Sequence, residues 1–210
     1  MNKQNFLIYD VETTGFPDNW GAPVENVSNW PEIVQIAWQK RNNEGEIVSS
    51  ASMIVKPDGY IIPQKSTDIH GITTERAKEV GSSLPLVMTL FAKEFTEDVK
   101  AGIPLVAVCH NVNFDKRVVG SRFCKLGGIA KTEFFPMFNS LPHFCTMQNS
   151  TDYCKLPNPK RKGTFKFPNL QELHFKVFGT QFEGAHTAGG DVDATANILF
   201  ALRKRGIFQI

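Results

Sequence analysis

Cysteine is scarce in this sequence, and no two cysteines form a C-x-x-C pair. The four that occur among 210 residues, Cys109, Cys124, Cys145 and Cys154, have no regular spacing. This argues against a disulfide framework and against the common zinc-ribbon pattern, so we interpret all four as reduced thiols. A zinc site built from His143, Cys145 and Cys154 is conceivable, but its spacing matches no established zinc motif.

Long apolar runs and a leader segment are also missing. No apolar run approaches the roughly 18 residues of a membrane span, and no charged segment followed by an apolar one opens the chain. We therefore expect neither a signal peptide nor membrane contact, and we expect a cytoplasmic location. The absence of repeats, low-complexity tracts and linkers predicts a single domain over residues 1–210.

Neither sign of charge is in clear excess. The chain has 23 Lys and Arg against 21 Asp and Glu, a formal net charge of +2. Bulk electrostatics therefore does not indicate a nucleic-acid partner, and any site for a polyanion must be local. One local candidate is the loop at 155–166, which is rich in Lys and Arg and contains no acid. Its Pro and Gly residues indicate a mobile loop, for which a solvated surface and phosphate contact are equally open roles.

The pattern of apolar residues predicts an α/β protein. Buried strands are expected at 5–11 and 103–109, and strands at 33–40 and 46–55 flank a hairpin turn at 42–45, which predicts a three-stranded antiparallel meander. Helices are expected at 74–80, 84–100, 113–125 and 169–178, and a last helix begins near Asp191. In the 84–100 helix, the predicted apolar stripe is Leu86, Leu90, Phe91 and Phe95. Residues 16–31 and 66–73 are expected to be loop and turn, and 127–145 stays unassigned.

Two carboxylates follow the first apolar run directly. In a strand, Asp10 and Glu12 point to the same face, so their like charges lie side by side. Such a pair is unfavourable unless one acid is protonated or a cation sits between them, and carboxylates suit a hard divalent cation. Alternatively, the strand ends at Tyr9 and both acids are ordinary loop residues in water.

Further acids stand at the ends of other elements. Asp115 follows the apolar strand at 103–109, in the first turn of a helix that Asn113 could cap. Asp191 lies at the start of the last helix, five residues after His186 on a glycine-containing loop. Asp193 is a competing ligand, but two residues along a helix it points to a different side.

Three motifs in this order resemble those of the DEDDh exonucleases, a family that includes the proofreading subunits and domains of bacterial replicative polymerases. They are D-x-E-T-T-G at 10–15, H-N-x-x-F-D at 110–115 and H-x-A-x-x-D at 186–191. The resemblance spans nearly the whole chain and is weakest at 16–31 and 127–168. It implies an RNase H-like fold, with a mixed sheet covered by helices on both faces. It also implies that Asp10, Glu12, Asp115 and Asp191 hold two Mg²⁺ or Mn²⁺ ions, with His186 as general base.

Residues that contact the substrate are less well defined. The resemblance favours Thr13, Thr14 and His70 near the terminal nucleotide, although roles in turns are the alternative. His110, Asn111 and Phe114 follow the second strand, where structural hydrogen bonding and substrate contact are both open. The candidates for stacking on bases are the aromatic side chains of Phe16, Trp20, Trp30 and Phe114, each of which could instead belong to the core.

The expected function is a 3′→5′ exonuclease that releases nucleoside 5′-monophosphates, from single-stranded DNA or primer ends. Trimming of RNA 3′ ends is the alternative within that class. We expect the protein either to work alone or to bind a DNA polymerase in trans, in DNA replication or repair. From other classes, a catalytically silent nucleic-acid-binding module has no need for four acids and a histidine together. A calcium-stabilised structural domain would not need His186.

Overall fold

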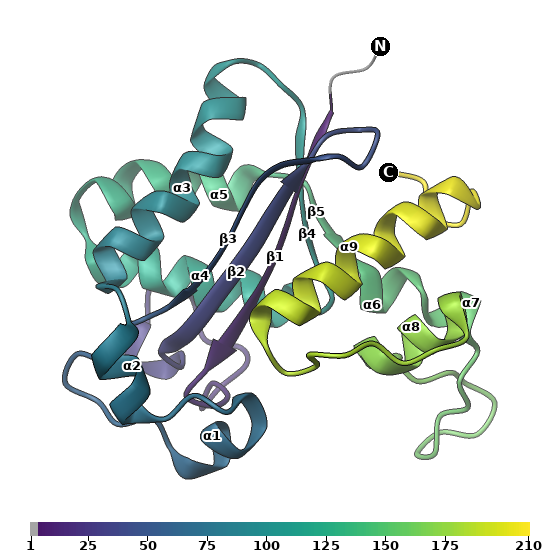
Figure 1. The fold of residues 1–210 in the computed structure, drawn as a ribbon, viewed down its shortest axis with the longest axis horizontal. Helices are drawn as coiled ribbons and strands as arrows, with labels where there is room; N and C mark the ends of the chain where they lie inside the picture. Colours follow the sequence, from purple (N-terminus) through teal and green to yellow (C-terminus); the bar gives the residue numbers. More distant parts are fainter. Residues whose placement is uncertain (1–3) are drawn as a thin grey trace.

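A five-stranded mixed sheet forms the centre of the protein (Figure 1). The computed structural model describes residues 4–210. The strand order is β3-β2-β1-β4-β5, in which β1, β2 and β3 form the expected antiparallel meander and β4 and β5 run parallel to β1. The strands are β1 Asn5–Thr13, β2 Ile33–Arg41, β3 Ile47–Ile54, β4 Leu105–Cys109 and β5 His143–Cys145.

Helices cover both faces of this sheet, as the α/β pattern predicts. Three of the helices confirm the sequence analysis closely, since predicted helices at 74–80, 84–100 and 169–178 correspond to α2, α3 and α8. The helices are α1 Gln64–His70, α2 Thr74–Val80, α3 Leu84–Lys100, α4 Val112–Leu126, α5 Phe135–Ser140, α6 Thr146–Asn149, α7 Thr151–Cys154, α8 Leu170–Phe178 and α9 Ala188–Lys204, with short turns η1 Val27–Asn29 and η2 Ala130–Phe134.

Three local predictions were wrong. The stretch expected to be a turn at 66–73 contains most of helix α1, which ends in a left-handed Gly71. Helix α4 begins at Val112, so Asn111 rather than Asn113 occupies its N-cap position, and no side-chain hydrogen bond caps this helix. On α3, Leu86 and Leu90 are exposed, because the core face consists of the neighbouring row, which includes Val87, Met88, Phe91 and Phe95.

The alternation of β1 assigns its side chains to two separate cores. Leu7, Tyr9 and Val11 pack under α3, α4 and α5, whereas Phe6 and Ile8 pack under α8 and α9. Because residues i and i+2 share a face, the next residues of the second set, positions 10 and 12, face the side of α9. This places two acids at the end of β1 beneath the start of the last helix.

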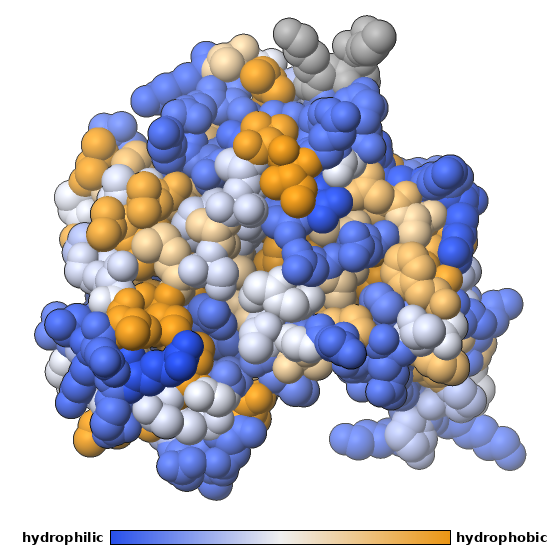
Figure 2. Space-filling view, viewed as in Figure 1, coloured by the Kyte–Doolittle hydropathy of each residue, from blue (hydrophilic) through white to orange (hydrophobic). Residues whose placement is uncertain are grey.

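The surface is indented at the end of the sheet where β1 finishes. Figure 2 shows this indentation in the outline of the molecule, between α1 and the loop that precedes α8. In the described part of the chain, no helix combines the length and the apolarity needed to cross a bilayer.

Candidate active site

Asp10, Glu12 and Asp191 converge at the end of β1. β1 continues to Thr13, so both of its acids lie within the strand, and the interpretation that they are loop residues beyond Tyr9 was wrong. Asp191 reaches them from the first turn of α9. One carboxylate oxygen from each residue lies within 4.8 Å of the other two, the spacing of a possible metal site. Among residues 4–210 no other such group forms, so the alternative of a His143, Cys145 and Cys154 zinc site gains no support.

Asp115 joins this cluster from the other neighbour of β1. The pairing of β1 with β4 stops at Ile8 and Val108, which leaves the later N–H groups on that edge of β1 without a strand partner. Asp115, in the first turn of α4, accepts a hydrogen bond from the Val11 N–H at 3.3 Å. The carboxylate is buried and takes the place of the missing strand.

Burial and mutual repulsion make ionisation of the four acids less favourable, which raises their pKa values. Burial and then the charges of Asp115, Asp191 and Glu12 raise the pKa of Asp10 well above its usual range. Burial raises the pKa of Glu12 to about 7, with a contribution from Asp191, and burial raises that of Asp115 to about 7 against its own hydrogen bonds. For Asp191, burial raises the pKa to about 6. Four oxygen donors that repel one another fit divalent cations of the Mg²⁺ or Mn²⁺ class.

His186 lies beside the cluster on an exposed loop. It has a φ of 64°, a left-handed conformation that a residue with a Cβ rarely adopts. Its charge and its backbone N–H both lower the pKa of Asp191, which opposes the effect of burial. Thr187 caps α9 by accepting a hydrogen bond from the Gly190 N–H at 3.1 Å, so the loop ends where the helix begins.

Asp193 is separated from the acids, as the helical spacing predicted. Its carboxylate accepts a hydrogen bond from the Gln39 side chain of β2. Gln35 of the same strand accepts a hydrogen bond from the Ala188 N–H at 3.2 Å. Strand β2 thereby fixes the start of α9 over the end of β1.

Gly190 is a residue of the site that the sequence analysis missed. A Cβ added there would lie 2.3 Å from the Gly184 carbonyl oxygen, too close for any side chain. At the adjacent Gly189, the nearest atom would be the Ser52 Oγ at an ordinary 3.7 Å. The loop that carries His186 therefore packs directly on the backbone of α9.

The Thr13 and Thr14 hydroxyls shape the turn that follows β1. Thr13 Oγ1 donates to the Gly15 carbonyl oxygen at 2.7 Å, and Thr14 Oγ1 accepts from the Glu32 N–H at 3.0 Å. Their role in the turn is therefore confirmed, while contact with a nucleotide stays a prediction.

His70 connects α1 to this turn. It is 6% exposed, and its Nδ1 accepts a hydrogen bond from the Ile72 N–H at 3.1 Å, which is the turn-stabilising role. Burial lowers the pKa of His70, while the Thr13 carbonyl acts in the opposite direction. Within residues 4–210, Nε2 has no hydrogen-bond partner at normal geometry.

His110 is held by internal contacts on both ring nitrogens. Nδ1 lies 3.0 Å from Thr146 Oγ1, and Nε2 lies 3.1 Å from the Pro168 carbonyl oxygen. Since a carbonyl can only accept, Nε2 carries the proton, and burial lowers the pKa of this histidine to about 4. The structural role of His110 is thus confirmed, whereas the Asn111 side chain makes no capping bond to α4.

Two exposed aromatic rings pack on the half-buried ring of Phe114, next to Asp115. Phe16 and Trp20 are 75% and 47% exposed, and their rings lie 5.8 and 5.9 Å from that of Phe114. A core position for Phe16 and Trp20 is therefore excluded. Trp30 is 3% exposed and donates its indole N–H to the Pro23 carbonyl, so its core alternative is confirmed and stacking on bases is excluded for it.

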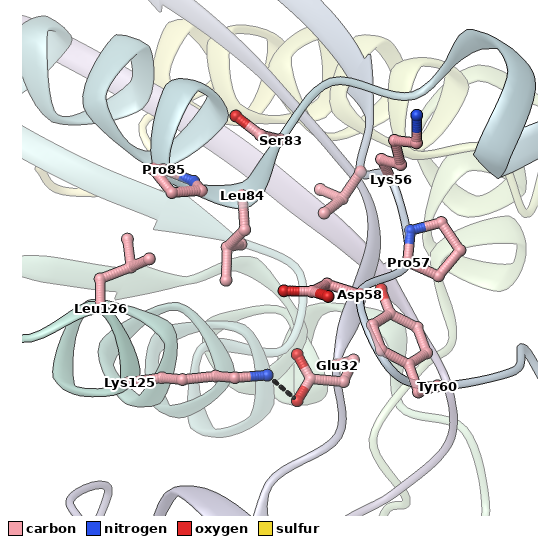
Figure 3. A pocket seen from close by; sticks show the side chains of 11 residues that line it. Glu32, Lys56, Pro57, Asp58, Tyr60, Ser83, Leu84, Pro85, Lys125 and Leu126 are labelled. Carbon is pink, nitrogen blue, oxygen red and sulfur yellow. Dashed lines mark hydrogen bonds and ion pairs between the residues drawn. The ribbon is translucent and has the colours of Figure 1, made fainter.

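Arg122 of α4 holds the 16–31 loop, and the sequence analysis missed it as well. Its buried guanidinium donates to the carbonyls of Val27 and Trp30 at 2.7 and 3.2 Å, and lies 2.5 Å from the Glu32 carboxylate. Lys125 reaches the same carboxylate at 2.6 Å (Figure 3). Both cations lower the pKa of Glu32 against the effect of burial.

A separate cavity of about 430 Å³ lies behind this ion pair, between β3, α3 and α4. Figure 3 shows Glu32 and Lys125 on one wall and Asp58 and Tyr60 beside them. None of the predicted site residues lines it.

Comparison with protein families assigns the chain to a family. The family described as exonuclease matches residues 7–199 of the chain, a span that includes all four acids and His186. The chain belongs to the exonuclease family. The predicted resemblance to the DEDDh 3′→5′ exonucleases and the prediction of an enzyme are thereby confirmed.

Related proteins and structures agree with this family. DNA polymerase III PolC-type of Streptococcus mutans is 27% identical over 204 residues, and that of Caldanaerobacter subterraneus is 27% identical over 202 residues. These matches cover 97% and 95% of this chain, but the chain spans only 11% and 12% of the length of those relatives.

Solved structures confirm the RNase H-like fold. E. coli Exonuclease I in complex with a dT13 oligonucleotide has a TM-score of 0.69 at 20% identity, over 96% of this chain and 41% of that chain. A zinc-bound form of the E. coli Exonuclease I complex with single-stranded DNA has a TM-score of 0.69 at 21% identity, over the same shares.

Proposed function

We propose that this exonuclease removes nucleotides from the 3′ end of single-stranded DNA, as nucleoside 5′-monophosphates, with two Mg²⁺ or Mn²⁺ ions. The observation that carries this proposal is the convergence of Asp10, Glu12 and Asp191 within 4.8 Å, with Asp115 on the adjoining edge of β1. These four residues would hold the ions. When bound, such ions activate water and stabilise the charge that develops on the phosphate and the leaving 3′ oxygen.

His186 would take the proton from the attacking water. A neutral imidazole suits this step because its usual pKa lies near working pH. The ring is exposed beside Asp191, at a backbone conformation that costs energy for a residue other than glycine. If the loop relaxes when substrate binds, the His186 ring would move relative to the acids. Such a movement suits a general base, which is needed only when substrate is present.

A single-stranded substrate is favoured over a duplex by the cluster of Phe16, Trp20 and Phe114. The exposed rings of Phe16 and Trp20 offer faces on which unpaired bases stack, whereas bases inside a duplex are already stacked. The choice of DNA over RNA rests on the relatives alone. The E. coli Exonuclease I complexes with single-stranded oligonucleotides are consistent with this choice.

The end of the strand would be held by the turn after β1. Backbone and hydroxyl groups of Thr13 and Thr14 border the acids, and the unpartnered Nε2 of His70 faces the same turn as a candidate donor. The uncommitted amide of Asn111 and the ring of Phe114 would contact the terminal nucleotide from the opposite side. A DNA polymerase bound in trans remains a proposed partner, in keeping with the PolC-type relatives.

The test uses matched oligonucleotides of single-stranded DNA, duplex DNA and RNA, labelled at the 5′ end. We expect Mg²⁺ or Mn²⁺ to produce a ladder of 5′-labelled products, fastest with single-stranded DNA, and a chelator to abolish it. Faster shortening of RNA would replace the DNA assignment with 3′-end trimming. If none of the three substrates is shortened with either metal, the proposal fails.

A further inference from the structure

The segment at 155–167, which we call the basic arm, is the most positively charged stretch of the chain. Among thirteen residues it has five cations and no acid: Lys155, Lys160, Arg161, Lys162 and Lys166. Lys166 pairs with Glu172 at 2.5 Å. In the described part of the chain, none of the other four forms an ion pair, so their charge is directed to solvent.

The arm has a defined shape. It is a small hairpin in which Pro157 bridges Phe165, the Asn158 N–H donates to the Thr164 carbonyl, and the Lys166 N–H donates to the Leu156 carbonyl. The last two bonds are 2.9 Å long. The cations at 160–162 form the tip, where the Asn158 side chain accepts from the Lys160 N–H at 2.9 Å. A shaped turn, rather than an unstructured linker, therefore presents these charges.

Aromatic side chains are interleaved with these cations. Phe165 and Phe167 are 42% and 56% exposed on either side of Lys166. Exposed rings beside positive charge are the combination that binds single-stranded nucleic acid, because the rings stack on bases while the cations contact phosphates.

The base of the arm is attached to the catalytic end of the sheet. The Pro168 carbonyl, directly after the arm, accepts the hydrogen bond from His110 Nε2 at 3.1 Å, and His110 follows the last residue of β4. Figure 1 shows the arm projecting at the lower right, on the side of the sheet that α8 and α9 cover. In Figure 2 it forms one wall of the indentation, and its surface is predominantly hydrophilic. The opposite wall is α1, which carries His70 at its end.

We infer that the basic arm is a second contact site for the substrate, which binds the single strand upstream of the nucleotide being removed. This inference rests on the proposed function. In this arrangement the terminal nucleotide would lie at the four carboxylates near the end of β1, and the arm would contact the phosphates and bases of the following chain. The arm therefore sets affinity for long strands and does not act on the reacting phosphate.

The test compares the triple variant Lys160→Ala, Arg161→Ala, Lys162→Ala with the unaltered protein. Binding of fluorescent oligo-dT in chelator, where nothing is cut, is measured against salt concentration. We expect the variant to bind roughly tenfold or more weakly at low salt, with a salt slope smaller by about 2, since each lost single-strand contact removes about 0.7. A control variant, Lys93→Ala, Lys100→Ala, Lys131→Ala, removes three exposed positive charges from α3 and η2, on the other face of the sheet, of which only Lys93 has an ion-pair partner within residues 4–210, Glu97.

Turnover gives a second readout. We expect the arm variant to raise KM for a long oligonucleotide, with kcat unchanged and with a dinucleotide hydrolysed as before, because a dinucleotide does not reach the arm. Phe167→Ala is expected to weaken oligo-dT binding by at least about fivefold through lost stacking.

The inference is overturned if the arm variant and the control variant bind oligo-dT alike, which would make the arm a solvated surface loop. It is also overturned if the dinucleotide is affected as strongly as the long strand. If the unaltered protein shortens no oligonucleotide, the proposed function fails, whereas the binding measurement still decides whether the arm holds a single strand.

Discussion

His186 is the residue on which the proposed proton transfer depends. We predict that His186→Ala lowers kcat by roughly 10²–10⁴-fold, the usual contribution of a general base. Affinity for Mn²⁺ is expected to persist, because the carboxylates supply the ligands. Kinetics together with calorimetric titration of Mn²⁺ checks both parts. Loss of metal affinity in the variant would reassign His186 as a ligand.

Gly190 controls where His186 lies. We predict that Gly190→Ala displaces the loop at 184–187, because the new methyl group would overlap the Gly184 carbonyl. Activity should fall at least about tenfold, since misplacement of a catalytic group by an ångström has large effects. The control is Gly189→Ala, where the added methyl meets only ordinary contacts and alanine favours the helix. Equal activity of the two variants would show that the loop is not held by this packing.

Site residues were predictable from the sequence where charged side chains occur in a stretch that is otherwise apolar. Asp10 and Glu12 follow an apolar run, and the motif order connected them to two more acids and a histidine. Arg122 and Gly190 gave no such signal. Arg122 binds a backbone carbonyl that is distant in sequence, and Gly190 packs against a backbone carbonyl in an irregular loop. A pattern of side chains does not report where carbonyl oxygens point.

At the scale of elements, α4 supports both the acid cluster and the loop that carries the exposed aromatic rings. We predict that Arg122→Met lowers the free energy of unfolding by about 3–5 kcal/mol, because Glu32 and two carbonyls lose a buried partner. Lys125→Ala is the control, since its half-exposed pair with Glu32 should contribute about 1 kcal/mol or less. Chemical denaturation measures both, and equal losses would contradict the structural role of the buried guanidinium.

Elements with strong periodicity were predictable, and irregular ones were not. The strands at β1, β2 and β3 follow from apolar runs around a hairpin turn, and α3 and α9 from their apolar faces. Helix α1 was missed because its sequence, Gln64–His70, is polar on nearly every side and buries only two residues. The segment at 127–145 folds into η2, α5 and β5, elements too short for a period to develop.

At the scale of the whole molecule, we predict that the acid cluster makes stability depend on pH and on divalent metal. Without metal, folding raises the pKa of Glu12 from 4.5 to about 7 and that of Asp191 from 3.8 to about 6. Stability from the protonated acids is therefore fully present below pH ~4 and is lost as pH rises through about 6 to 7. The loss should be on the order of 2 kcal/mol after allowance for solvent screening.

Thermal unfolding at pH 5 and pH 8 measures this linkage. In chelator, we expect Tm to fall between the two pH values by more than it does in Glu12→Gln, which lacks one of the titrating groups. Mn²⁺ should raise Tm more at pH 8 than at pH 5, because protons compete for the same oxygens. A metal-induced rise in Tm that is equal at both pH values would contradict this account.

The overall architecture was predictable because the motifs and the strand pattern agreed. The mixed sheet and its helical layers were expected, and the acids lie at the end of β1 as anticipated. The indentation between α1 and the basic arm was not predictable, since neither wall has a marked hydrophobic pattern and their separation depends on the packing of α8 and α9.

The most direct test of the central claim compares two aspartates, one inside the acid cluster and one outside it. Asp10 belongs to the acid cluster, whereas Asp193 bonds to Gln39. Shortening of a 5′-labelled single-stranded DNA in Mg²⁺ is followed for the unaltered protein, Asp10→Asn and Asp193→Asn. We predict product ladders for the unaltered protein and Asp193→Asn, and none for a folded Asp10→Asn. Retained turnover in Asp10→Asn would contradict a metal-dependent site at the end of β1.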